Sequence, residues 1–201
     1  VAFQAQVGHE AVDTLAEALG EANDQSLLDA AAKALIYAMD VPEPAIAGFS
    51  ARAGQRLTQA VGERLNTLPI DDRLDDRLKP LSRAMAEVRT AITQRRGDVD
   101  AGWRSDVMQM YGRAGALGFR FVRAERAGRI SDADAEGLRQ SVGTTIQLAS
   151  TIPPLLRIDR ATQDQLSDIQ LAVNFNRAPQ DDGDAFQRSA TSLIRVLGDE
   201  F

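Results

Sequence analysis

The chain contains no cysteine and only one histidine, His9. The lack of cysteine excludes disulfide bridges, thiol catalysis and thiolate metal sites. A histidine-based metal site, or a serine nucleophile with a histidine base, would have to use a residue near the start of the chain. Carboxylates are abundant, but their spacing selects no pair for acid–base work. We therefore predict a protein that is not an enzyme and that has no catalytic residue, metal or cofactor.

Long hydrophobic runs are missing as well. No stretch approaches the ~20 uninterrupted apolar residues that a membrane-spanning helix requires. Because the chain begins at Val1 rather than at Met, we expect a fragment or a processed protein. Membrane contact is then expected only through segments outside this fragment.

The charge is unevenly distributed around a net value of −6. Residues 101–130 contain six arginines against two acidic residues, whereas residues 1–40 contain seven acidic residues against one lysine. A nucleic-acid partner requires a basic domain or a dense basic stripe, and the acidic flanks would repel phosphate. We predict no nucleic-acid binding.

The helical period dominates the apolar pattern. The chain has 201 residues, 44% of them hydrophobic, which is enough for a core without disulfides. No stretch alternates in the two-residue period of a half-buried strand. The predicted fold is all-α: an antiparallel bundle of about seven to eight helices with little or no sheet. We expect one helical domain, 1–201, which could divide into sub-bundles 1–99 and 100–201.

The most hydrophobic helical stretch covers residues 100–126. Its apolar residues recur at alternating steps of four and three, in two adjacent stripes. Such a wide apolar face predicts the central helix of the bundle. Glycine in a helix costs about 1 kcal/mol relative to alanine, so three glycines in this helix, Gly112, Gly115 and Gly118, require a structural explanation. We interpret them as sites where another helix packs closely, rather than as a phosphate-binding loop.

Other helices are expected before and after this central one. Proline, glycine and capping residues set their limits. Pro80 is expected to kink the helix of segment 70–97, or to follow a short turn before a helix that begins near Lys79. The short link 97–100 predicts that this helix and the central one form an antiparallel hairpin. The remaining helices are expected at 9–19, at 26–40, from Glu43 or Pro44 to before Pro69, from Ser131 to before Pro153, at 161–176 and at 184–197.

The acidic repeat between Asp71 and Leu78, DDRLDDRL, lacks the glycine-containing loop of a calcium site. Carboxylates near a helix start are stabilised by the helix dipole and by basic residues three or four positions along. We therefore interpret the repeat as a helix start with ion pairs.

Pairs of arginines are the strongest candidates for a binding site. Arg52 and Arg56 are one turn apart on one expected helix, and Arg113 and Arg120 are two turns apart on the central helix. Each pair can present guanidinium groups along one face, which suits a small anion or a carboxylate. Exposed arginines in ion pairs would show the same pattern.

The order of features in residues 45–111, about a third of the chain, suggests a family. The residues that carry it are Phe49, Gln55, Arg56 and Thr58, then Leu74, Leu78, Leu81, Arg89 and Ile92, and then Tyr111. This order resembles the bacterial NIT-type sensor domain, an all-helical extracytoplasmic module named for nitrate and nitrite sensing. The family's Glu-Arg-Gly-like stretch is replaced by Ala32, Lys33 and Ala34, and its Asp after the Gln-Arg pair is absent.

The resemblance implies a helical sensor or receptor domain without implying nitrate specificity. It also adds Tyr111 to the candidate ligand-binding residues and favours a periplasmic or extracytoplasmic location over the cytoplasm. The first hypothesis is therefore a non-enzymatic module that senses or binds a small ligand, as the extracytoplasmic part of a bacterial receptor.

The alternative is a helical adaptor, chaperone or secretion-associated protein that holds another protein, or a second copy of itself, in an apolar groove. A polar pocket containing Arg56 or Arg113 would favour the ligand, whereas an exposed apolar groove would favour a protein partner.

Overall fold

The computed structural model describes residues 47–95, 97, 99–157, 160–175 and 183–198, which form an all-α fold of six packed α-helices without a strand. The helices expected at 9–19 and 26–40, and the start expected at Glu43 or Pro44, lie outside the described residues. The described part therefore has fewer helices than the seven to eight that we predicted. Its elements are α3 (Ala47–Thr67), α4 (Leu74–Gln94), α5 (Ala101–Arg126), α6 (Asp132–Ser150), the 3₁₀ turn η1 (Pro153–Leu155), α7 (Arg160–Phe175) and α8 (Gly183–Leu197).

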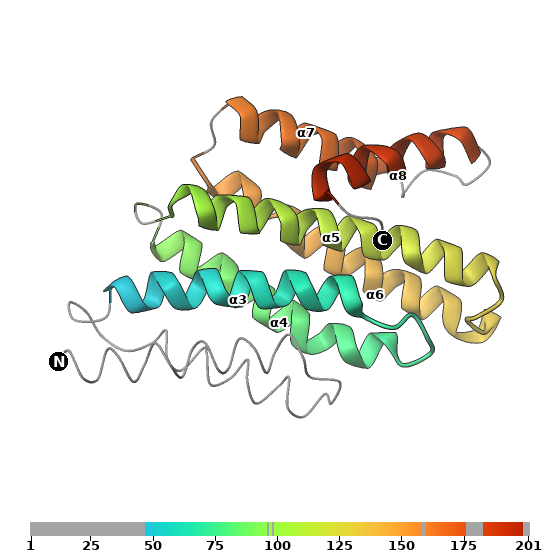
Figure 1. The fold of residues 1–201 in the computed structure, drawn as a ribbon. Helices are drawn as coiled ribbons and strands as arrows, with labels where there is room; N and C mark the ends of the chain where they lie inside the picture. The colour runs from blue at the N-terminus through green and yellow to red at the C-terminus, as the bar shows by residue number, and fades with distance from the viewer. Residues whose placement is uncertain (1–46, 96, 98, 158–159, 176–182, 199–201) are drawn as a thin grey trace.

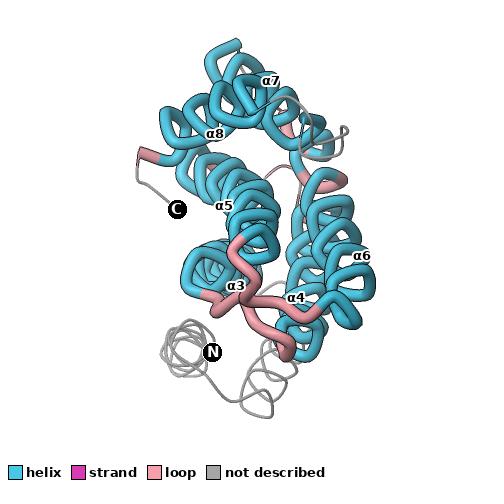
Figure 2. The backbone as a smooth tube through the Cα atoms, turned by 90° about the vertical axis from the view of Figure 1, so that its right-hand side faces the viewer, coloured by secondary structure: helices cyan, strands magenta, loops and turns pink. Residues whose placement is uncertain are grey.

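Helix α5 is central, as its apolar pattern predicted. Fifteen of its 26 residues are buried, and it packs against α3, α6, α7 and α8. Helices α3, α4, α5 and α6 form a four-helix bundle. Helices α7 and α8 form an outer layer on the side of α5 that faces away from α3 (Figures 1 and 2). The buried side chains of these helices form one hydrophobic cluster that includes Trp103, Phe119 and Phe121.

Several predicted helix ends are confirmed. The Asp100 carboxylate accepts a hydrogen bond from the Trp103 backbone N–H at 2.8 Å and thereby caps α5. Ser131 caps α6 by accepting a bond from the Asp134 backbone N–H at 3.3 Å. Helix α6 ends before the two prolines, the first of which, Pro153, begins η1. Helix α4 continues through Pro80 from Leu74, so the alternative start near Lys79 is wrong.

The predicted hairpin of α4 and α5 is only half right. The two helices run in opposite directions along a short link, but they do not pack side by side: α4 packs on α3 and α6, and α5 packs on α3 and α6 from the opposite corner (Figure 2). Residues 95–100 can extend over roughly 20 Å, which exceeds the diagonal of about 14 Å between helices spaced ~10 Å apart. A short link therefore did not require adjacent helices.

Small residues explain why α5 packs on α3 instead. A Cβ atom built on Gly54 would lie 2.6 Å from Cζ2 of Trp103, and one built on Gly62 would lie 3.5 Å from the Met110 Cα. Gly54 is therefore required for the Trp103 ring to approach α3, whereas a methyl group at Gly62 would make only ordinary contacts; helix α4 contains no glycine. The chain thus places the large side chains of α5 against gaps on α3.

Glycines of α5 serve the other layer in the same way. A Cβ atom at Gly112 would lie 2.8 Å from Cδ2 of Leu197, and one at Gly115 would lie 2.7 Å from Cγ2 of Val173. The predicted role of these glycines in close helix packing is confirmed, and α7 and α8 are the helices that approach. Gly118 is buried as well.

The acidic repeat begins α4, as interpreted from its sequence. Asp71 pairs with Arg77 at 2.7 Å, and Asp75 pairs with Lys79 at 2.7 Å. Asp75 also accepts a hydrogen bond of 2.6 Å from the Ser141 hydroxyl of α6. Hydrogen bonds from Lys79 and then Ser141 hold the pKa of Asp75 below its usual range.

Replacement of Gly54 tests the contact between α3 and α5. We expect Gly54→Ala to lower the free energy of unfolding by about 1–3 kcal/mol, because the buried Trp103 ring has to move. Gly62→Ala is the matched control on the same helix, since its new methyl group meets only ordinary contacts. It should be neutral or stabilising by up to about 1 kcal/mol. Urea unfolding of both variants measures this difference, and equal stabilities would contradict the packing argument.

Asp75 should make the free energy of unfolding depend on pH in the acidic range. Because its pKa is lowered in the folded state, its contribution is present above the ordinary value of 3.8 and is lost as pH falls through the folded pKa. We expect Asp75→Asn to destabilise the protein at pH 7 by less than about 1 kcal/mol, since the side chain is partly exposed. The difference from wild type should shrink below pH ~4. Urea unfolding across this pH range, with Ser141→Ala as the control that removes one donor, checks the prediction; a constant difference would contradict it.

Candidate functional site

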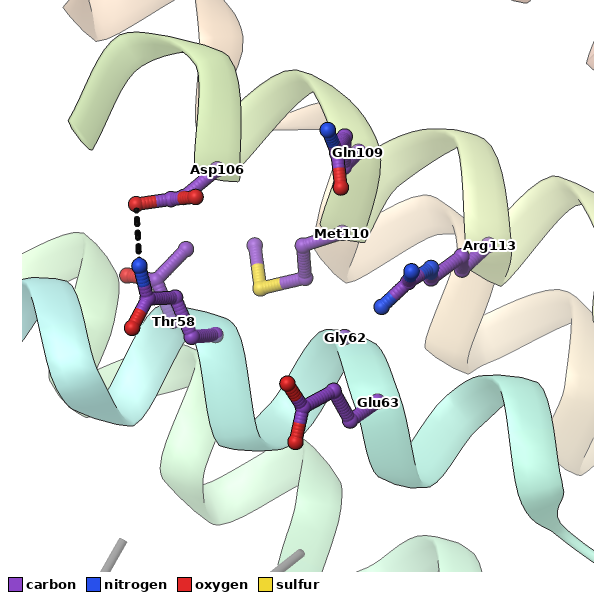
Figure 3. A pocket seen from close by; sticks show the side chains of 8 residues that line it. Thr58, Gly62, Glu63, Asp106, Gln109, Met110 and Arg113 are labelled. Atoms are coloured by element: carbon purple, nitrogen blue, oxygen red, sulfur yellow. Dashed lines mark hydrogen bonds between the residues drawn. The ribbon is translucent and has the colours of Figure 1, made fainter. Parts of the chain in front are cut away.

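A polar pocket lies between α3 and α5, with a volume of about 230 Å³ (Figure 3). Helices α3 and α5 run in the same direction, so residues at similar depth along both helices face each other (Figure 1). The pocket is lined by Thr58, Gln59, Gly62 and Glu63 of α3 and by Asp106, Gln109, Met110 and Arg113 of α5. It is therefore built by two helices that are separated by the whole of α4 in the sequence.

Helical periodicity puts three side chains of α5 on the pocket side. Asp106, Met110 and Arg113 are separated by four and three residues, so they lie on one face. Asp106 is at one end, Arg113 is at the other, and the buried Met110 side chain lies between them (Figure 3). The pocket thus has an acidic end, a basic end and an apolar floor.

The acidic end is held by a network of amides. Oδ2 of Asp106 accepts hydrogen bonds from Nε2 of Gln55 and Nε2 of Gln59, each at 3.0 Å. The amide oxygen of Gln59 accepts from Nη1 of Arg56 at 3.2 Å. These contacts fix the Asp106 carboxylate and leave Oδ1 without a hydrogen bond from the described residues.

A buried hydroxyl anchors the wall below this network. The Thr58 hydroxyl donates to the Gly54 carbonyl at 2.7 Å and accepts from the Trp103 indole N–H at 2.9 Å. Both side chains are buried, with Thr58 at 0% and Trp103 at 1% exposure. This pair holds α3 and α5 in register at the closed side of the pocket.

Arg113 forms the basic end. Its Nη1 lies close to α3, 3.6 Å from the position of a Cβ atom at Gly62. Its Nε atom is buried and donates to no acceptor among the described residues. A buried donor without a partner costs about 1–3 kcal/mol, so an acceptor brought to this guanidinium would be favoured.

Arg120, predicted to bind a ligand together with Arg113, has other contacts. Its Nη1 donates to the carbonyl oxygens of Leu65 at 2.9 Å and of Asn66 at 2.5 Å, and its Nη2 donates to the Leu68 carbonyl. These carbonyls belong to the end of α3 and the residue after it, where backbone acceptors lack intrahelical donors. Arg120 therefore caps α3, and burial lowers its pKa.

The other predicted ligand-binding residues are dispersed. Arg56 is exposed and does not line the pocket, although its Nη1 donates to the lining residue Gln59. Tyr111 is 2% exposed and belongs to the core rather than to the pocket lining. Arg52 is part of α3, but its side chain lies outside the described residues. Of the five candidates, Arg113 is the one that lines this pocket.

Sequence reasoning missed the remaining charged lining residues, Asp106 and Glu63. The spacing of Asp106, Met110 and Arg113 on the central helix was an available signal. This spacing indicates a site only when α3 faces the stripe, whereas the predicted hairpin would pair α5 with α4.

Metal binding and membrane insertion find no support in the described ranges. They contain no group of three or more His, Cys, Asp or Glu side chains placed to hold a metal ion. None of the helices in these ranges is both long and apolar enough to cross a membrane.

Comparisons with other proteins add no identification. No protein-family model, no curated protein and no solved structure matches the chain.

Substitution of Arg120 separates a capping role from a binding role. We expect Arg120→Met to lower the free energy of unfolding by about 2 kcal/mol or more, since hydrogen bonds from a charged donor contribute roughly 1.5–3 kcal/mol. The exposed Arg188 of α8 provides the control Arg188→Met, which should stay within about 0.5 kcal/mol of wild type. Thermal and urea unfolding measure both. An unchanged stability of Arg120→Met would contradict the capping role.

Proposed function

We propose that this chain is a non-enzymatic helical module that senses a small polar ligand, as the extracytoplasmic part of a bacterial receptor. The observation that supports it best is the pocket between α3 and α5, with the Arg113 guanidinium at one end. A guanidinium offers fixed parallel donors that match a carboxylate or a similar small anion. The ligand is therefore expected to place an anionic group against Arg113.

The position of the pocket suits sensing. Its lining comes from two parallel helices, so a ligand that contacts both favours those arrangements of α3 and α5 that fit it. A ligand shifts a conformational equilibrium only by its difference in affinity between states. A ligand that bridges two helices can supply such a difference. The resemblance to NIT-type sensor domains covers α3, α4 and the first part of α5, which includes most of this lining.

The lining also supports a role without catalysis. Among the residues that line the pocket, Thr58 is the one with a hydroxyl group. That hydroxyl already forms hydrogen bonds with the Gly54 carbonyl and the Trp103 indole N–H. An activated nucleophile needs a neighbouring base within hydrogen-bonding distance, and neither of these partners is a base.

The alternative, a protein-binding adaptor, receives less support from the described residues. Among them Leu171 is the exposed large hydrophobic side chain, at 69%. Scattered single apolar residues are normal on a protein surface, whereas interaction sites are contiguous patches of several hundred Å².

Thermal-shift measurements against nitrate, phosphate and a set of carboxylates, amino acids included, test the proposal. At a hundred times its dissociation constant, a ligand should stabilise the wild type by ~2.7 kcal/mol, which corresponds to roughly 5–10 °C in Tm for a chain of this size. Arg113→Gln should abolish the shift.

The control is Arg188→Gln, an exposed change on α8, which should keep the full shift. If no compound stabilises the wild type, or if Arg113→Gln responds as the wild type does, the proposed function is wrong.

A further inference from the structure

The charges of the pocket define its ligand more narrowly than an arginine alone would. Arg113 contributes one positive group, whereas Asp106 and Glu63 contribute two carboxylates. A simple anion would gain the guanidinium but meet two negative groups in the same small volume. Charge complementarity therefore favours a ligand that carries both signs.

Among the described residues, both carboxylates keep acceptor capacity for a new partner. Oδ2 of Asp106 is held by Gln55 and Gln59, which orients the carboxylate toward the pocket and leaves Oδ1 to accept. Glu63 lies at the exposed rim, and its carboxylate has no hydrogen bond or ion pair with the described residues. An ammonium group, with three donors, fits such acceptors.

The two ends are separated by a fixed length. Asp106 and Arg113 are seven residues apart on α5, which places their Cα atoms about 10 Å apart. The two charged side chains leave α5 toward α3 on either side of Met110, so a ligand that contacts both has to hold its own charges apart (Figure 3). The floor between the ends is the apolar Met110 side chain (Figure 3). A short aliphatic chain would cover this floor.

From this arrangement, and on the basis of the proposed function, we infer that the pocket between α3 and α5 binds an ω-amino acid. In this assignment the carboxylate contacts Arg113, the ammonium contacts Asp106, and the methylene chain lies on Met110. An α-amino acid carries both charged groups on one carbon and has no chain to lie along Met110 between the two ends (Figure 3).

Isothermal titration of the whole chain with a length series tests the inference. The probes are glycine, β-alanine, 4-aminobutyrate, 5-aminopentanoate and 6-aminohexanoate, together with butyrate and butylamine, which each carry one charge. We expect the affinity to be lowest for glycine and to pass through a maximum along the series of ω-amino acids. 4-Aminobutyrate should bind at least about tenfold more tightly than butyrate or butylamine, since each charge-assisted contact contributes on this scale.

Two variants test which pocket residue contacts which charged group of the ligand. Asp106→Asn should reduce the affinity for 4-aminobutyrate to that for butyrate, whereas Arg113→Gln should reduce it to that for butylamine. The exposed Asp164 of α7 supplies the matched control Asp164→Asn, which should change neither. Should Asp106→Asn fail to fold, Gln59→Leu, which removes one of the two donors that orient the Asp106 carboxylate, should still weaken 4-aminobutyrate severalfold and leave butyrate unaffected.

The outcomes separate this inference from the proposed function. If butyrate binds as tightly as 4-aminobutyrate and both require Arg113, the pocket is an anion site and the ω-amino acid assignment is wrong. A flat length series, or an unchanged affinity of Asp106→Asn for 4-aminobutyrate, overturns it as well. If no probe binds and the anion panel also fails, the proposed function itself is lost.

Discussion

The close parallel contact between α3 and α5 is the interaction on which the described structure depends. At one end, the Trp103 ring occupies the space beside Gly54, and its indole N–H bonds to the buried Thr58 hydroxyl. At the other end, Arg120 donates to carbonyl oxygens at the end of α3. The two helices are thus fixed on both sides of the pocket along their length, by the Thr58–Trp103 contact at the edge of its lining and by Arg120 beyond it.

Helix α5 has to serve two packing layers at once, and this explains its unusual glycine content. Large side chains such as Trp103 and Met110 fill the space toward α3, while Gly112 and Gly115 admit Leu197 and Val173 from the outer layer. The loss of helix propensity at a glycine, about 1 kcal/mol, is offset by the apolar contacts that the close approach permits. A displacement of α5 would therefore change its contacts both with α3 and with α7 and α8.

Arg113 and Arg120 show how one side-chain type takes two roles along a single helix. Both point toward α3, two turns apart. Arg120 meets the end of α3, where carbonyl acceptors are exposed, and becomes part of the scaffold. Arg113 meets the middle of α3 beside Gly62, where backbone carbonyls are already used within the helix. Its guanidinium therefore remains available to the pocket.

The sequence by itself determined the helices of the described part, because periodicity, capping residues and prolines act over a few neighbouring positions. Ser131, Pro153 and the glycines of α5 had their predicted effects for this reason. Only the tertiary structure decided which helices are neighbours: the link after α4 is long enough to cross the bundle, and local patterns carry no information about the facing helix. Arg113 could be selected as a candidate from one helix alone. Asp106 and Glu63 could not be selected in this way, because they line one pocket only when α3 packs against α5 in the observed register.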